Sequence, residues 1–171
     1  MLVVSRVLVP HDFSEASARV LPHGLALAAK MRARLYVLHV TDRDDTPYPA
    51  RDLRAIREEL REAGVASEEA LRAVHIEGVS RKDGGVAETI HRFADEEEID
   101  LIAQGTRGRR GPRRVLMGSV AEAVIRGADR PVLTLRGEEA EVPPVPGQME
   151  RLLVPVDFSE NAREAGRTAA E

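Results

Sequence analysis

Short runs of consecutive apolar residues alternate along this chain with longer segments in which apolar residues recur every three or four positions. The runs are typical of strands buried on both faces, and the longer segments are typical of amphipathic helices. The runs predict strands at 6–10, 35–40, 71–77, 100–105 and 132–135. The periodic segments predict helices at 16–31, 53–63, 86–94 and 119–128. Strands that alternate with helices indicate βα units and therefore a parallel sheet.

The first predicted helix contains two residues that disfavour helical structure. Ser14 is a suitable N-cap just before it. Pro22 removes a backbone hydrogen-bond donor, and Gly24 lowers helix propensity. Both residues therefore weigh against an unbroken helix over 16–31.

A glycine- and arginine-rich segment between the fourth predicted strand and the last predicted helix is the main candidate for chemistry. It reads Gly105-Thr106-Arg107-Gly108, then nine residues, then Gly118-Ser119. Glycines let the main chain approach a ligand closely, and a helix start presents N–H groups and positive potential. This combination suits a phosphate, with Arg107 placed to neutralise charge and Ser119 able to cap the helix or contact a phosphate oxygen or Mg²⁺. The alternative interpretation is a basic loop followed by an ordinary helix cap.

A second candidate position follows the first predicted strand. Ligands of open parallel sheets bind beyond the carboxyl ends of the strands, where Pro10, His11 and Asp12 lie. Asp12 could accept hydrogen bonds from ribose hydroxyls or serve as an acidic residue at a helix start, and its chemistry alone does not choose between these roles.

Composition and charge narrow the classes of function. The 171 residues include no Cys, which excludes disulfides, a cysteine nucleophile and thiolate-bound zinc. A net charge of -4, with arginines gathered in the glycine segment, favours a small anionic ligand over a nucleic acid. No apolar run approaches the roughly 20 residues that span a bilayer, and the N-terminus has no signal-peptide pattern. We expect a cytoplasmic protein without a membrane span.

Catalytic motifs are missing from the sequence. It contains neither the P-loop of ATPases nor the dinucleotide fingerprint, and its five His lack metal-ligand spacing. No residue is assigned as a catalytic group or as a metal ligand, and the chain is expected to hydrolyse a nucleotide slowly or not at all.

The chain repeats its own beginning. Residues 151–160 echo residues 6–15, including the apolar run and the Asp-Phe-Ser-Glu that follows. Residues 138–149 are rich in proline and glutamate, as in a linker. We therefore expect a domain at 1–137, a linker at 138–149 and the start of a second copy at 150–171.

Together these motifs resemble the universal stress protein family, in particular its ATP-binding branch. The family pattern of Gly, two residues, Gly, nine residues, Gly and Ser or Thr is matched by Gly105, Gly108, Gly118 and Ser119. The resemblance implies an α/β fold, a doubly wound five-stranded parallel sheet in the order 3-2-1-4-5 with helices on both faces. It implies homodimers through Val132–Leu135. The chain departs from the family pattern at His11, Gln104 and Pro112, where apolar residues are usual.

The resemblance also implies a site and a function. Adenine and ribose would be held near Pro10, Asp12 and Val40. The phosphates would be held by Gly105, Arg107, Gly108, Gly118, Ser119 and Val120. We expect a stress-response regulator that binds ATP with Mg²⁺ and whose nucleotide state modulates dimerisation or partner binding. Two alternatives stay open: a hydrolase or transferase acting on an adenine nucleotide, and a dimeric interaction module without ligand.

Overall fold

Five strands form one all-parallel sheet in the order β3-β2-β1-β4-β5, as predicted. The computed structural model describes residues 3–42, 67–82, 84–106 and 118–135, together with Arg54, Glu58, Arg61, Glu62, Glu160 and Arg163. The strands are β1 (Arg6–Pro10), β2 (Arg34–Thr41), β3 (Ile76–Lys82), β4 (Leu101–Gly105) and β5 (Val132–Leu135). The linker and the second copy expected beyond residue 137 lie outside the described residues, apart from two positions.

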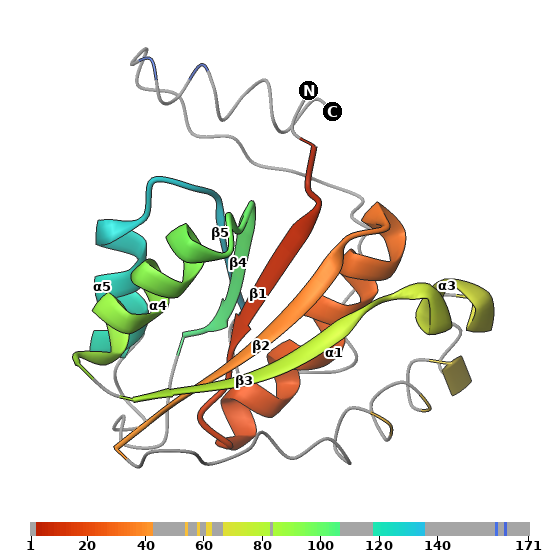
Figure 1. Ribbon diagram of the computed structural model, residues 1–171, viewed down its shortest axis with the longest axis horizontal. Helices are drawn as coiled ribbons and strands as arrows, with labels where there is room; N and C mark the ends of the chain where they lie inside the picture. Colours follow the sequence, from red (N-terminus) through yellow and green to blue (C-terminus); the bar gives the residue numbers. More distant parts are fainter. Residues whose placement is uncertain are drawn as a thin grey trace.

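Helices cover both faces of this sheet, again as predicted (Figure 1). The helices α1 (Glu15–Met31) and α3 (Glu68–Ala73) pack on one face. The helices α4 (Val86–Glu96) and α5 (Ser119–Gly127) pack on the other. Of the helix expected at 53–63 the structure describes four residues, all helical: Arg54, Glu58, Arg61 and Glu62.

The central strand β1 explains why its sequence is a continuous apolar run. Val7 and Val9 are fully buried on the face that α1 covers, and Leu8 is fully buried on the opposite face. A strand with helices on both sides has no solvent-facing residues and needs no polar alternation.

Helix α1 runs without a break from Glu15 to Met31, although Pro22 and Gly24 weigh against an unbroken helix. The Ser14 side chain caps its start by accepting a hydrogen bond from the Ser17 N–H, at 3.1 Å. Gly24 lies where the helix presses on the sheet, because a Cβ there would be 2.4 Å from Val9 Cγ2. Burial of the apolar face of α1 therefore outweighs the low helix propensity of two residues.

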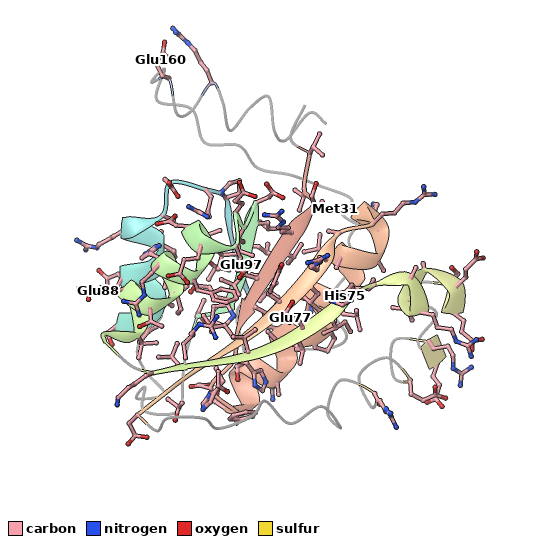
Figure 2. All side chains as sticks on the ribbon, viewed as in Figure 1. Met31, His75, Glu77, Glu88, Glu97 and Glu160 are labelled. Carbon is pink, nitrogen blue, oxygen red and sulfur yellow. The ribbon has the colours of Figure 1, made fainter. Side chains whose placement is uncertain are left out.

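The strand expected at 71–77 exists, but its expected start is wrong by five residues. Its first three residues belong to α3, which Ser67 caps by accepting from the Ala70 N–H at 3.1 Å, and β3 begins only at Ile76. Leu71 and Val74 are both buried, three positions apart, which is a helical spacing rather than a strand alternation. Because β3 is an outer strand, polar residues such as Glu77 remain exposed on it and obscure its pattern (Figure 2).

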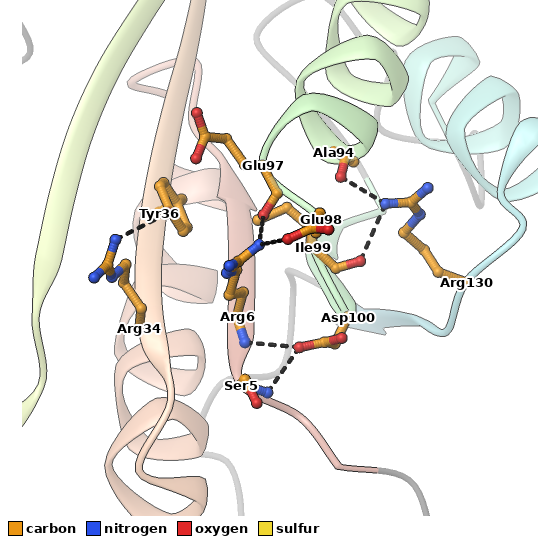
Figure 3. A network of polar contacts seen from close by, with 10 residues as sticks. All are labelled: Ser5, Arg6, Arg34, Tyr36, Ala94, Glu97, Glu98, Ile99, Asp100 and Arg130. Carbon is orange, nitrogen blue, oxygen red and sulfur yellow. Dashed lines mark hydrogen bonds and ion pairs between the residues drawn. The ribbon is translucent and has the colours of Figure 1, made fainter.

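Two polar groups hold the amino-terminal edge of the sheet together. The Asp100 carboxylate accepts from the backbone N–H groups of Ser5 and Arg6 at 2.7 and 2.9 Å (Figure 3). The Arg6 guanidinium donates to the Glu97 carbonyl at 2.8 Å and pairs with Glu98. These contacts join the starts of β1 and β4.

Arg130 joins the start of β5 to the same edge. Its guanidinium donates to the carbonyls of Ala94 and Ile99, at 2.7 and 3.0 Å, and pairs with Asp95 and Asp129 (Figure 3). The side chain is only 14% exposed. Burial works to lower the pKa of Arg130, but its hydrogen bond to Asp129 and the two carboxylates outweigh this and raise it. The amino-terminal edge is thus tightly bonded, and the opposite edge carries the candidate site.

Candidate functional site

The strand order reverses between β1 and β4, and this reversal defines the candidate site. From β1 the chain continues outward through β2 and β3, then crosses back to β4 and β5 on the other side. After β1 the chain enters α1 on one face, whereas after β4 it reaches α5 on the other. Connections that leave on opposite faces create a crevice at the carboxyl ends of the strands, where sheets of this kind bind ligands.

The turn after β1 is fastened to the neighbouring strand β2. The His11 N–H donates to the Leu38 carbonyl at 2.8 Å, and His39 Nδ1 donates to the His11 carbonyl at 2.9 Å. Phe13 follows with a φ of 59°, a left-handed conformation that is uncommon for a bulky residue. Its ring packs against His39 and His11, with centroids 4.5 and 5.0 Å apart, and remains 38% exposed. The turn is therefore held in one conformation at the carboxyl end of β1.

Asp12 has a structural role in this turn. One of its carboxylate oxygens, Oδ1, accepts from the Ser14 N–H at 3.0 Å and so supports the start of α1. The two roles considered from the sequence are compatible, because a carboxylate has two oxygens that each accept hydrogen bonds.

Pro10 and Val40 lie at the same edge as Asp12. Pro10 is the last residue of β1 and is paired in register with Leu38, and Val40 lies two residues further along β2. Val40 is half-buried and packs against the core on the α4 side. Leu8 of β1 is paired in register with Ile102 of β4. Two residues further along both strands, Pro10 therefore lies at about the level of Gln104.

The segment between β4 and α5 begins and ends at one point. The Thr106 N–H donates to the Leu135 carbonyl at 3.0 Å, which continues the pairing of β4 with β5. The Thr106 carbonyl then accepts from the Gly118 N–H at 2.6 Å. Gly105 and Gly118 are thereby brought together. Arg107 and Gly108, also expected at the site, lie outside the described residues.

Among the residues that the structure describes, no side chain caps the start of α5. Gly118 occupies the N-cap position, with φ of -77° and ψ of 153°, and Ser119 is the first helical residue. The capping role considered for Ser119 is therefore wrong. Ser119 is exposed, and Val120 beside it is 41% exposed. A helix start without a side-chain acceptor keeps N–H donors and positive potential for another acceptor, and an anion fits best.

Two buried polar residues of this junction, Gln104 and Thr106, are absent from the site predicted from the sequence. Gln104 is 4% exposed, and its Nε2 donates to the Ala121 carbonyl of α5 at 3.1 Å. Thr106 is 8% exposed, and its Oγ1 has no hydrogen-bond partner among the described residues. The sequence does carry one signal for Gln104. It is an amide residue that directly follows the apolar run Leu101-Ile102-Ala103, and a polar side chain at such a position indicates a buried hydrogen bond.

The structure thus groups the expected residues in two clusters at one edge. Pro10, Asp12 and Val40 lie at the ends of β1 and β2, and Gly105, Gly118, Ser119 and Val120 lie at the end of β4 and the start of α5. A surface hollow at α3, lined by acidic residues and Arg72, lies before β3 at the opposite edge and does not belong to this site. Within the described part of the chain, no helix has the length and apolar character of a membrane span, and no three His, Asp or Glu residues gather as metal ligands.

Comparison with known proteins agrees with this architecture. The model of the Universal stress protein family matches residues 4–136. Universal stress protein MJ0531 of Methanocaldococcus jannaschii is 33% identical over 151 residues, covering 80% of this chain and 84% of the relative.

Solved structures show the same fold. Universal stress protein UspA from Lactobacillus plantarum has a TM-score of 0.57 at 28% identity, covering 78% of this chain and 98% of its own. A universal stress protein solved in complex with cAMP has a TM-score of 0.55 at 24% identity, covering 80% and 99%. On the family match and the shared fold, this chain belongs to the universal stress protein family.

Proposed function

We propose that this protein binds ATP together with Mg²⁺ at the carboxyl edge of its sheet, and that the bound nucleotide regulates its assembly or its contacts with partners. The observation that carries the proposal is the junction between β4 and α5. There the Thr106–Gly118 hydrogen bond places the end of a strand beside a helix start that no side chain of the described ranges caps.

The phosphate tail would occupy this junction. Gly105, Gly108 and Gly118 would allow close approach of the main chain, and Ser119 and Val120 would contribute backbone N–H groups of the α5 start. The Ser119 side chain is exposed, which fits a hydroxyl that contacts a phosphate oxygen or Mg²⁺. Mg²⁺ is usually held by substrate phosphates with few protein ligands. Arg107 would balance the negative charge.

The nucleoside would lie toward β1 and β2. Asp12 would accept from ribose hydroxyls, and Pro10 with the main chain of Val40 would border the adenine. The turn from His11 to Phe13 is held by hydrogen bonds to β2. This supports the assignment, because a turn that is already ordered loses little conformational entropy when a nucleotide binds to it. The family structure in complex with cAMP supports it further, since that fold holds an adenine nucleotide.

A regulatory role is preferred over an enzymatic one. No residue of the site is assigned as a general base, so hydrolysis would be slow or absent. The outer strand β5 is half-buried along its whole length, which fits pairing with a second copy into a homodimer. We further propose a nucleotide-binding domain at residues 1–137, a linker at 138–149 and the start of a second copy at 150–171, in a cytoplasmic protein.

Calorimetric titration of the full chain with ATP and Mg²⁺ tests the proposal. We expect Arg107→Gln to weaken ATP binding, whereas Arg126→Gln, the same charge change at the far end of α5, leaves it unchanged. Asp12→Asn keeps an oxygen for the Ser14 N–H and should weaken both ATP and adenosine. Light scattering with and without ATP then measures any change of assembly. Failure of the unaltered chain to bind millimolar ATP would rule out the proposal, and steady turnover would favour the enzyme alternative.

A further inference from the structure

Gln104 is a buried polar residue in a strand that otherwise needs none. Its neighbours Leu101, Ile102 and Ala103 are apolar and buried, and β4 lies between two other strands with helices on both faces. Burying a carboxamide costs free energy unless its hydrogen bonds are replaced. Gln104 replaces one by donating from Nε2 to the Ala121 carbonyl at 3.1 Å.

The acceptor does not need this hydrogen bond. Ala121 lies in the first turn of α5, and in an α-helix its carbonyl already accepts from the N–H four residues later, that of Ile125. A carbonyl oxygen has two lone pairs and accepts the Gln104 amide in addition. Replacing Gln104 by an apolar side chain of similar size would therefore leave no buried acceptor unpaired, and the hydrogen bond is a weak candidate for a purely stabilising contact.

The hydrogen bond from Gln104 to Ala121 fixes the position of α5 relative to β4. Together with the 2.6 Å bond from the Gly118 N–H to the Thr106 carbonyl, it ties the first turn of α5 to the strand at two points. Strand alternation puts the Thr106 side chain on the same face as Gln104, and the buried Thr106 Oγ1 has no partner among the described residues. Buried polar side chains at the contact between a strand and a helix call for an explanation, and the residues beside these two are Gly118 and Ser119.

We propose that Gln104 is a positioning residue that holds the start of α5 where the phosphate tail of the nucleotide binds. This inference rests on the function proposed above. Its consequence is selective: Gln104 controls how tightly the phosphates are bound and has no influence on the nucleoside, which lies toward β1 and β2. A hydrogen bond of this kind corresponds to a loss of about threefold to tenfold in affinity when it is removed.

The test compares two ligands and three variants of the full chain by calorimetry. Gln104→Met and Gln104→Leu remove the donor while keeping apolar volume in the strand. Thr89→Val removes another buried polar group as the control, on α4, where the Thr89 hydroxyl accepts from the Gly84 N–H and the Arg92 guanidinium. We expect both Gln104 variants to bind ATP about threefold to tenfold more weakly and adenosine as tightly as before, and we expect Thr89→Val to leave the ratio of the two affinities unchanged.

Hydrogen exchange without ligand gives a second readout. The Glu122 N–H, which bonds to the Gly118 carbonyl at 3.0 Å, should exchange faster in the Gln104 variants than in the unaltered chain. Equal loss of ATP and adenosine binding, an unchanged ATP affinity, or failure of both variants to fold would each overturn the inference. If the unaltered chain bound adenosine but not ATP, the proposed function itself would fall, and the positioning role with it.

Discussion

Gly24 offers a sharp test of how α1 packs on the sheet. Replacing it with alanine has two opposing effects. Alanine is the better helix former, which would stabilise the fold by about 1 kcal/mol. The added Cβ would meet Val9 Cγ2 at 2.4 Å, although carbon atoms in contact normally lie about 3.5–4.0 Å apart.

The steric effect should win. Val9 is fully buried in the central strand and branched at Cβ, so its methyl group has no free space or alternative rotamer to occupy. Overpacking of this kind costs about 1–3 kcal/mol, and the large overlap places Gly24→Ala toward the upper end. After the gain in helix propensity, we expect a net destabilisation of about 1–2 kcal/mol.

A double-mutant cycle measures the clash directly. Val9→Ala removes the methyl group that the new Cβ would meet, so Gly24→Ala should become stabilising, by up to about 1 kcal/mol, in that background. The chain has no Trp, so urea unfolding is best followed by far-UV circular dichroism. Gly84→Ala is the control, because a Cβ at Gly84 would meet no atom within 4 Å. An equal effect of Gly24→Ala in both backgrounds, or stabilisation of the unaltered chain, would refute the proposed close contact.

Three further predictions concern the stability of the domain. Burial lowers the pKa of His23 from its ordinary value of 6.5. His23 therefore binds a proton more readily in the unfolded chain than in the folded one, and the free energy of unfolding should fall as the pH drops below about 6.5. His23→Gln should reduce this pH dependence, whereas His75→Gln at an exposed position should not. Arg130→Ala removes the guanidinium that donates to the carbonyls of Ala94 and Ile99, of which Ala94 keeps the Ile99 N–H, and should cost about 2–3 kcal/mol in urea unfolding. Arg72→Ala on the surface of α3 should cost under about 0.5 kcal/mol, and equal losses would contradict the network. Ser14→Ala removes the cap of α1 and should cost about 1 kcal/mol by the same measurement, with Ser14→Gly losing less.

Most of the fold could be predicted because its strands and helices differ in apolar period. The run Val7-Leu8-Val9 is buried on both faces and reads as a central strand, while the stripe through Ile90 and Phe93 reads as a helix that lies on the sheet. The boundary between α3 and β3 could not be predicted, because Leu71 and Val74 are buried by tertiary packing that local sequence does not specify.

The site was predictable only in part. The glycine spacing placed Gly105 and Gly118 at one edge of the sheet, as the structure has them. It gave no indication that Gly118 rather than Ser119 occupies the N-cap, because both residue types are favoured there. The link from Gln104 to Ala121 joins residues far apart in the sequence, and only the packing of α5 on β4 brings them together.

The hydrogen bond between Thr106 and Gly118 has a consequence for engineering. Thr106 and Gly118, which flank residues 107–117, are held together, so a segment of any length between them starts and ends at a single point. Closing a flexible chain costs only about 0.6 kcal/mol more for each doubling of its length. Foreign sequences could therefore be grafted between these two anchors to select other anions, while the surrounding scaffold keeps its shape.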